Sequence, residues 1–273
     1  MSAFAADWLA LREAADAAAR DRTLTGQLAT SLHGPLRVVD LGAGTGANLR
    51  YLAPRLAGPQ HWYLLDHDPA LLAHARRRSS DMHAADGRAV TVREQCCNLT
   101  RTPPADWPAA DLLTASALLD LVGRSWLTRL ARQAARRRCA VLLTLSYSGA
   151  MDWQPADAVD AALVSAFNAH QQAQRPFAEP ALGPRAAAAA AADLAAAGLQ
   201  VRQAASDWHL GPGQSELLAA LIDGWVAAAS EQQPARAQRF HAWGERRRQQ
   251  LAEQALTARV SHVDVLALPE SAV

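Results

Sequence analysis

Short, nearly continuous apolar runs alternate with helical stretches through the first half of this chain. The runs are bounded by Gly, Pro, Asn or Asp and predict strands near residues 37–41, 61–66, 90–95, 111–116 and 139–146. Runs that are apolar at almost every position fit a sheet covered on both faces, which is typical of parallel α/β folds. The first thirty residues predict helix instead.

The first apolar run breaks into a glycine-rich turn. Gly42, Gly44 and Gly46 follow it, and leucines at helical spacing come next, which predicts strand, tight turn and helix. Glycines there let a ligand approach the backbone, and the helix N-terminus offers free N–H groups. Asp66, about twenty residues beyond the turn and at the end of the next run, is placed to accept hydrogen bonds from a ribose diol. The pattern predicts a nucleotide-type ligand site.

Two cofactors fit this spacing. Gly42 to Ala47 satisfies the G-x-G-x-x-A fingerprint of an NAD(P)- or FAD-dependent oxidoreductase. Asp40, however, brings a negative charge that opposes a diphosphate and suits an ammonium. At this point the chain resembles the class I S-adenosylmethionine-dependent methyltransferases, whose first motif is an acid, one residue and G-x-G-x-G. Asp40, Gly42, Gly44 and Gly46 match that motif.

The resemblance covers about the first 150 residues and implies a fold. The family has a mostly parallel seven-stranded sheet flanked by helices, so the fold class expected here is α/β. Residues 199–205 and 260–266 would supply the last two strands, the final one antiparallel. The implied cofactor is S-adenosyl-L-methionine, with S-adenosyl-L-homocysteine as product.

The same resemblance implies a set of cofactor-binding residues. Asp66 matches the ribose-binding acid, and Asn98 stands where the family often has Asp, facing the adenine amino group beside the Leu99 backbone. Ser116, after the fourth strand that Asp111 opens, would lie beneath the cofactor. The expected set is Asp40, Gly42, Ala43, Gly44, Gly46, Asp66, His67, Asn98, Leu99 and Ser116.

Two segments depart from the plain family pattern. We expect one methyltransferase domain over 1–273, with an N-terminal helical segment at 1–30 and a cofactor-binding core at 31–148. Segments 149–198 and 211–257 would be helical insertions that form a lid and recognise the substrate.

Methyl transfer from a sulfonium is an in-line displacement that needs a base only if the acceptor holds a proton. Asp152, Tyr147 and His170 lie in the expected acceptor region and are the candidate catalytic residues, while Trp153 and Phe177 are candidates to stack on a ring. The alternative is structural: packing for the aromatic residues, a cap for Asp152 and a surface position for His170.

Other segments invite a functional interpretation. In an extended segment, Asp207 and His209 would point opposite to Trp208. Arg12 could reach the cofactor carboxylate or be an ordinary surface residue. The runs 76–78, 136–138 and 246–248 are each three arginines, but consecutive helix residues diverge by about 100° and form no single stripe.

Composition narrows the function class. All 27 basic residues are Arg, so no lysine can form a Schiff base, and the net charge is only +1. The three cysteines complete neither a disulfide framework nor a metal site, and we expect a cytoplasmic protein of a GC-rich bacterium. No segment suggests a membrane span, and nucleic acid is not an expected partner. Monomer and homodimer both stay open.

The end of the fourth strand also bears on the acceptor. It reads Thr-Ala-Ser-Ala-Leu-Leu, where relatives that methylate exocyclic amines of bases typically carry Asn/Asp-Pro-Pro-Tyr/Phe. A small-molecule acceptor is therefore expected, with attack by O, N, S or C undecided. A methyltransferase acting on RNA or protein is the alternative.

Overall fold

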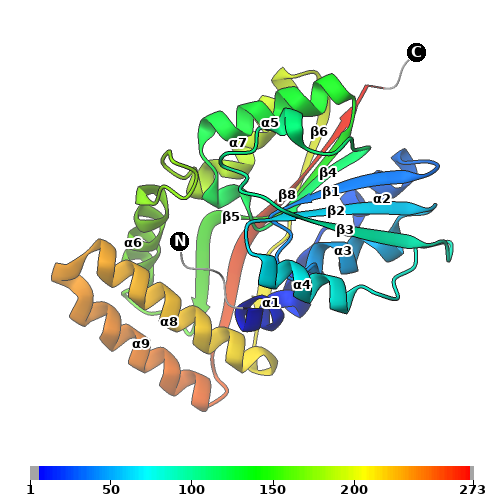
Figure 1. The fold of residues 1–273 in the computed structure, drawn as a ribbon. Helices are drawn as coiled ribbons and strands as arrows, with labels where there is room; N and C mark the ends of the chain where they lie inside the picture. The colour runs from blue at the N-terminus through cyan, green and yellow to red at the C-terminus, as the bar shows by residue number, and fades with distance from the viewer. Residues whose placement is uncertain (1–5, 271–273) are drawn as a thin grey trace.

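Seven strands lie side by side in the order β3-β2-β1-β4-β5-β8-β6 in the computed structural model, which describes residues 6–270 (Figure 1). The first five run parallel, and β8 pairs antiparallel with β5 and β6. This confirms the predicted sheet, and a short eighth strand, β7, adds to β8. The strands are β1 (Leu36–Leu41), β2 (Gln60–Asp66), β3 (Val90–Cys96), β4 (Leu112–Ser116), β5 (Ala140–Gln154), β6 (Leu199–Ala205), β7 (Trp208–Leu210) and β8 (Thr257–Pro269).

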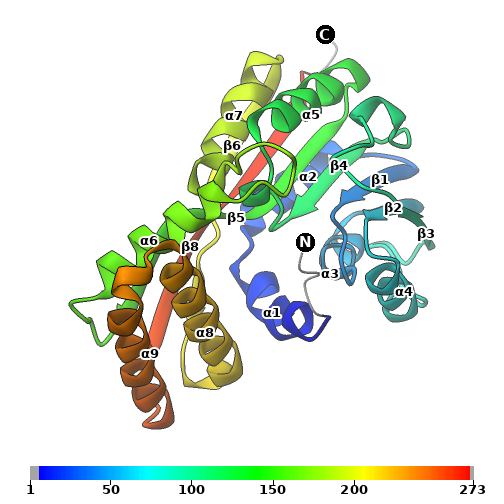
Figure 2. The same ribbon diagram turned by 60° about the vertical axis from the view of Figure 1, so that its left-hand side comes forward.

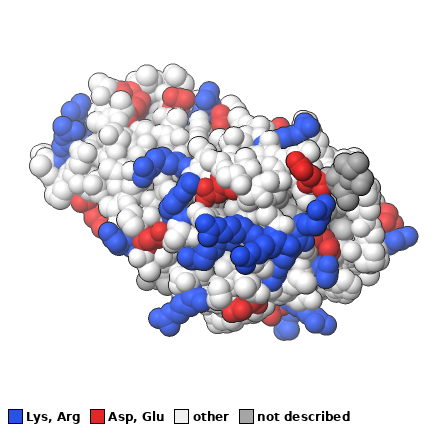
Figure 3. All heavy atoms as spheres, turned by 90° about the horizontal axis from the view of Figure 1, so that it is seen from above, with Lys and Arg blue, Asp and Glu red and all other residues white. Residues whose placement is uncertain are grey.

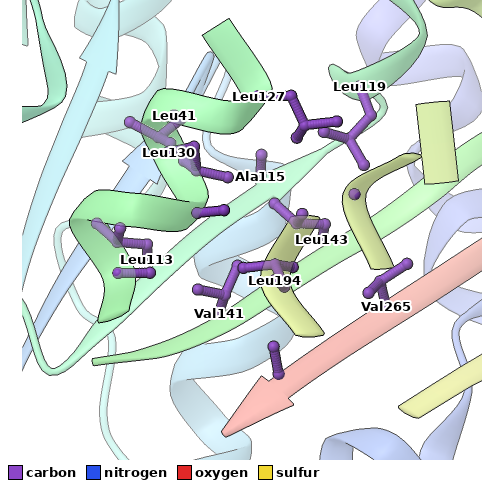
Figure 4. Close-up of a cluster of buried hydrophobic side chains, with 14 of the residues drawn as sticks. Leu41, Leu113, Ala115, Leu119, Leu127, Leu130, Val141, Leu143, Leu194 and Val265 are labelled. Carbon is purple, nitrogen blue, oxygen red and sulfur yellow. The ribbon is translucent and has the colours of Figure 1, made fainter. Parts of the chain in front are cut away.

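Helices cover both faces of this sheet. α5 (Arg124–Arg137) and α7 (Ala186–Ala196) pack on one face, and α2 (Arg22–Ser31), α3 (Ala47–Leu52) and α4 (Pro69–Arg78) lie on the other. Figure 4 shows Leu127 and Leu130 of α5 directed toward the strand side chains that include Leu113 and Leu143. The two packed faces explain why the central strands β1, β4 and the first half of β5 are apolar at nearly every position. Because α7 is part of this core, assigning residues 186–196 to a lid was wrong.

Beyond the sheet, β5 and β8 continue together into a second packed region. β5 does not stop near residue 146 as predicted but runs to Gln154, paired with the first half of β8. One face of this extension carries α6 (Asp160–Ala173), α8 (Ser215–Gln232) and α9 (Ala237–Ala252), which we call the helical lobe (Figures 1 and 2). Its core is rich in Trp and separate from the cores of the sheet. The helical content predicted for 211–257 is confirmed.

The N-terminal helical segment is two helices rather than one. α1 (Ala6–Ala19) ends before Arg20, and Asp21 caps α2 by accepting a hydrogen bond from the Leu24 N–H. Residues 1–5 of the predicted segment lie outside the described residues. α1 lies between the sheet and the helical lobe (Figure 2), where it contacts β7 and α8. This position brings it over the carboxyl ends of the parallel strands.

Arginine side chains gather in a band on one face (Figure 3). The arginines 136 to 138 at the end of α5 nevertheless go different ways: Arg137 donates to the carbonyls of Ala105, Trp107 and Pro108, and Arg138 donates to that of Glu270, while Arg136 is exposed. Arg137 and Arg138 therefore bind backbone carbonyls of other segments, and residues 136–138 do not form one continuous basic surface. Among residues 6–270, no helix is both long and apolar enough to cross a membrane.

Candidate functional site

The glycine loop between β1 and α3 turns through left-handed backbone conformations. Gly42, Gly44 and Gly46 have φ of 66°, 53° and 79°, values that favour residues without a Cβ. A Cβ at Gly44 would lie 3.1 Å from Leu9 Cδ1 of α1, and one at Gly42 would lie 3.1 Å from Leu118. Leu9 of α1 and Leu118 of the segment after β4 therefore both lie close to the loop backbone.

Asp66 is fixed at the end of β2, beside this loop. One carboxylate oxygen accepts the Gly44 N–H at 2.8 Å, and the other accepts the Asp68 N–H at 3.0 Å. His67 Nδ1 lies 3.2 Å from Asp66 Oδ1, and its ring is half exposed. Each carboxylate oxygen can accept a further hydrogen bond, so Asp66 keeps capacity for two ribose hydroxyls. Its predicted role fits this geometry.

Asp40 is buried at the end of β1. Its Oδ1 accepts the Asn48 amide at 2.7 Å, while its Oδ2 is buried and has no partner. Burial raises the pKa of Asp40 to about 7, although the Asn48 hydrogen bond and the charge of Arg20 both favour the carboxylate. A buried acceptor without a donor is costly. The free oxygen suits a cationic ammonium, as the sequence suggested.

Arg20, which the sequence reasoning missed, joins this region to β4. Its guanidinium is buried and donates to Asn48 Oδ1 at 2.7 Å and to Ser116 Oγ at 2.9 Å. Desolvation lowers the pKa of Arg20, and the carboxylates of Asp264, Asp16 and Asp40 counteract this. Ser116 thus serves first as an acceptor for Arg20. No local motif marks Arg20, because its partners are more than twenty residues away in sequence.

Asn98 and Leu99 lie at the turn after β3. Asn98 Oδ1 accepts the Thr100 N–H at 2.9 Å, and the Leu99 carbonyl accepts Trp126 Nε1 at 3.1 Å. The Asn98 amide group is left to donate, so it differs from the aspartate expected of relatives, which only accepts. Asp111, by contrast, pairs with Arg37 at the opposite, amino end of the sheet and is remote from the site.

α1 is held over the glycine loop by ion pairs. Glu13 accepts from Arg50 of α3 at 2.7 Å and from Arg78 of α4 at 2.8 Å. These two arginines lower the pKa of Glu13 in spite of its burial. Together with the Leu9 contact at Gly44, they make α1 a roof over the expected cofactor site.

Five side chains from five elements gather where the sheet meets the helical lobe. Trp208 and His262 have ring centroids 5.0 Å apart, Tyr147 and His262 6.2 Å apart, and the Arg12 guanidinium lies 4.9 Å from the Trp208 ring. Asp120 is linked to these side chains through charge: Arg12 opposes the rise in the pKa of Asp120, and Asp120 contributes to the raised pKa of Tyr147. We call Arg12, Asp120, Tyr147, Trp208 and His262 the interlobe cluster.

Asp120 is the acid of this cluster, and the sequence reasoning missed it. It lies in the short 3-10 helix η3 (Leu119–Leu121), four residues after Ser116, and accepts Gln171 Nε2 of α6 at 3.2 Å. Burial raises the pKa of Asp120 to about 6, opposed by Arg12 and Gln171. Its position just after β4 was the available signal, since ligands bind beyond strand carboxyl ends.

Tyr147 and His262 face each other across β5 and β8, and both are buried. The Tyr147 hydroxyl and His262 Nδ1 have no hydrogen-bond partner. Desolvation raises the pKa of Tyr147 and, with the charge of Arg12, lowers that of His262 to about 3. Tyr147 therefore stays protonated at neutral pH and can donate a hydrogen bond, and His262 is neutral.

Arg12 borders the interlobe cluster from α1. It is paired with Asp16 at 2.9 Å, and Asp16 also accepts Trp208 Nε1 at 3.0 Å. Trp208 is buried while His209 is exposed, which confirms that neighbours in this extended segment point in opposite directions. Arg12 is thus held inside the molecule and is not an ordinary surface residue.

The other acceptor-side predictions fare differently. Asp152 is exposed on the face of β5 opposite Met151 and Trp153 and lies 3.9 Å from Arg259, so its position gives no support for a catalytic role. His170 Nε2 lies 3.3 Å from Glu231 Oε2, where α6 meets α8, and takes no part in the interlobe cluster. The two aromatic candidates pack instead: Trp153 against Trp243, and Phe177 against Trp126.

Residues 38–138 match the family model described as a methyltransferase domain. The matched segment runs from β1 to the end of α5 and contains the glycine loop, Asp66, Asn98 and Asp120. No curated protein sequence matches the chain.

Solved structures also resemble this fold. The cyclopropane synthase MmaA2 from Mycobacterium tuberculosis is 13% identical, with 90% of this chain and 81% of that chain covered and a TM-score of 0.48. A geranyl diphosphate methyltransferase in complex with S-adenosylmethionine is 16% identical, with coverage of 90% and 83% and a TM-score of 0.47. A phosphoethanolamine N-methyltransferase from Haemonchus contortus is 16% identical, with coverage of 89% and 51% and a TM-score of 0.42. These are distant similarities, and none bears on the acceptor of this chain.

Proposed function

We propose that this chain, whose residues 38–138 match a methyltransferase domain, is a class I S-adenosylmethionine-dependent methyltransferase that methylates a small molecule bound at the interlobe cluster. The observation that carries the proposal is that the two parts of the site are close in sequence: Asp120 of the cluster comes four residues after Ser116, which lies beside the cofactor residues. A donor on the glycine loop and an acceptor at the cluster would meet across this segment.

Residues at one end of the site would bind the cofactor, and residues at the other end would bind the acceptor. Asp66 would hold the ribose, Asp40 the amino-acid ammonium, and the glycine loop would lie against the rest of the cofactor. Bound S-adenosylmethionine supplies a methyl group on a positively charged sulfur. The protein must then align the acceptor and exclude water, which contributes much of the rate enhancement in such a displacement.

A small acceptor is favoured over a macromolecule because three members of the interlobe cluster are buried. α1 lies over it from one side and the helical lobe from another, and Tyr147, Trp208 and His262 are at most 6% exposed. A small ligand can bind among buried side chains, whereas a protein or RNA strand needs an open groove to approach.

The test is the destination of labelled methyl groups. The full chain with methyl-labelled S-adenosylmethionine should label the small-molecule fraction of a bacterial extract. Labelling of RNA or protein alone would contradict the proposal. Calorimetric binding of S-adenosylhomocysteine in the micromolar range, weakened by Asp66→Ala, checks the cofactor half separately.

A further inference from the structure

We infer that Arg20 is a positioning residue for the cofactor: through Asn48 it holds Asp40 as the carboxylate that receives the amino-acid ammonium. The inference rests on the S-adenosylmethionine-dependent function proposed above, and it adds a residue that acts on the ammonium without touching it. Arg20 lies between α1 and α2, outside the segment that matches the methyltransferase domain. It is therefore not part of the glycine motif that predicted the cofactor.

Arg20 is held in one place by its surroundings. The neighbouring Asp21 N–H donates to Asp264 Oδ2 of β8 at 3.1 Å, and Asp264 Oδ1 accepts the Leu145 N–H of β5 at 2.8 Å. Arg20 Cζ lies 4.4 Å from the centre of the Tyr51 ring, and Arg20 is buried. A long side chain loses rotamer freedom when it is buried. The guanidinium is therefore ordered in the protein without a ligand.

The hydrogen bonds around Asn48 run in one direction. A guanidinium only donates, and Arg20 Nη1 donates to Asn48 Oδ1 at 2.7 Å. The amide nitrogen of Asn48 donates to Asp40 Oδ1 at 2.7 Å and to Thr114 Oγ1 at 3.1 Å. Thr114 accepts there because its own hydroxyl donates to the Leu142 carbonyl at 2.8 Å. Asn48 thus has one orientation, which carries the influence of Arg20 to Asp40.

Asp40 receives this support on one oxygen and keeps the other free. Asp40 is buried, with Oδ1 held by Asn48 and Oδ2 without a partner. A buried carboxyl group stays ionised where donors and a positive charge favour its charged form. Arg20 supplies that charge one amide group away. The ammonium of the cofactor would then give Oδ2 the charged donor that it lacks.

The competing role for Arg20 is direct binding of the cofactor carboxylate, because Arg20 Nε is also buried without a partner. Its two terminal nitrogens, however, donate within the protein, to Asn48 and to Ser116. This favours the indirect role. The two roles act on different groups of the ligand, so ligands that carry one group without the other separate them.

The experiment measures the affinity of the full-length chain for three probes by calorimetry. S-adenosylhomocysteine carries the ammonium and the carboxylate, its decarboxylated form keeps only the ammonium, and methylthioadenosine lacks both. The test variant is Arg20→Met, and Arg55→Met is the matched control. Arg55 also lies against the Tyr51 ring, 4.0 Å from its centre, but it is exposed and donates to the Tyr51 carbonyl.

We expect Arg20→Met to bind both ammonium-bearing probes about tenfold more weakly and methylthioadenosine within about twofold of wild type, because only the ammonium needs the ordered carboxylate. Arg55→Met should match wild type for all three probes. A loss for S-adenosylhomocysteine alone would overturn the inference, because it would place Arg20 on the carboxylate. An equal loss for all three probes would also overturn it, because Arg20 would then only support the fold of the site.

Asn48→Ala keeps the test decisive where Arg20→Met does not fold. It changes no charge and removes the amide that connects Arg20 with Asp40. It should show the same selective loss, and the double variant should lose little more than either single variant, since both act on one route. Losses that add would contradict a route through Asn48.

Failure of the proposed function has a different signature. A wild-type chain that binds none of the three probes would overturn the proposed cofactor and this inference with it. Labelling of RNA or protein alone would overturn only the proposed acceptor and would leave the role of Arg20 standing.

Discussion

The cofactor half and the acceptor half of this molecule are built in different ways. The cofactor half draws Asp40, the glycine loop and Asp66 from one short stretch around two neighbouring parallel strands. The interlobe cluster draws its five residues from positions 12 to 262, nearly the whole chain. A binding site built from one short stretch of chain can be recognised from the spacing of its residues in the sequence. A site assembled by tertiary packing of distant residues cannot.

The two halves also rest on different cores. The cofactor residues sit on the strands that α2 to α5 and α7 cover, while the acceptor side depends on the Trp-rich core of the helical lobe. Substitutions in the core of the helical lobe should therefore weaken acceptor binding and lower the free energy of unfolding more than they weaken cofactor binding. The predictions below use this separation.

The largest expected effect is on stability, and it comes from breaking the buried ion pair of the helical lobe. Arg247 is fully buried and donates to Asp160 Oδ1 at 2.5 Å, and Trp243 Nε1 donates to the same oxygen at 2.7 Å. Asp160→Ala leaves a buried cation unpaired and should lower the free energy of unfolding by about 3–5 kcal/mol. Chemical denaturation measures it. Asp223→Ala, which breaks an exposed pair with Arg248 in the same lobe, should change stability very little.

The second-largest expected effect is on the affinity for the cofactor. Asp66→Ala removes the carboxylate expected to accept two ribose hydroxyls and should weaken S-adenosylmethionine binding about 100-fold, since each hydrogen bond to a charged group contributes about 1.5–3 kcal/mol. Asp68→Ala is the control, because Asp68 caps α4 by accepting from Ala70 and Leu71. It should lower stability and leave affinity intact. Equal losses of affinity in both variants would show that the α4 cap, rather than Asp66, governs binding.

Two members of the interlobe cluster should give stability profiles of opposite slope. The pKa of Asp120 is raised to about 6, so between about pH 4 and 6 folded Asp120 keeps a proton that the unfolded chain releases, and stability falls as pH rises. The pKa of His262 is lowered to about 3, so between about pH 3 and 6.5 the unfolded chain binds the extra proton, and stability rises with pH.

Thermal melts of Asp120→Asn and His262→Gln in steps of pH measure these slopes. With rising pH across this range, wild type should lose stability relative to Asp120→Asn and gain it relative to His262→Gln. Difference curves of the same sign would contradict the environments assigned to the two groups.

The smallest expected effect is on the rate of product release, from a change in α1. This helix covers the expected cofactor site and also carries Arg12 of the interlobe cluster. Glu13→Gln weakens the contacts of α1 with Arg50 and Arg78, and should speed release of S-adenosylhomocysteine a few-fold, because such half-buried pairs contribute little more than about 1 kcal/mol each. Stopped-flow dissociation measures this rate. Asp7→Asn, an exposed change on the same helix, should leave it unchanged.

The sequence predicted the centre of the sheet well because β1, β4 and the first half of β5 are covered on both faces and are therefore apolar at nearly every position. It predicted the end of β5 wrongly, because the strand beyond Leu145 is stabilised by its pairing with β8 more than a hundred residues later. Asp120 and Arg20 escaped for the same reason: their surroundings come from distant elements. Asp152 was chosen for its neighbourhood in sequence, although strand alternation turns it away from Met151 and Trp153.

A crystal structure of the chain with S-adenosylhomocysteine would test the central claim, that the two halves meet at the segment from Ser116 to Asp120, most directly. We predict that the ribose hydroxyls lie on Asp66 and that the sulfur faces the interlobe cluster across this segment. A sulfur directed toward any other surface, with the interlobe cluster closed off from it, would contradict the account.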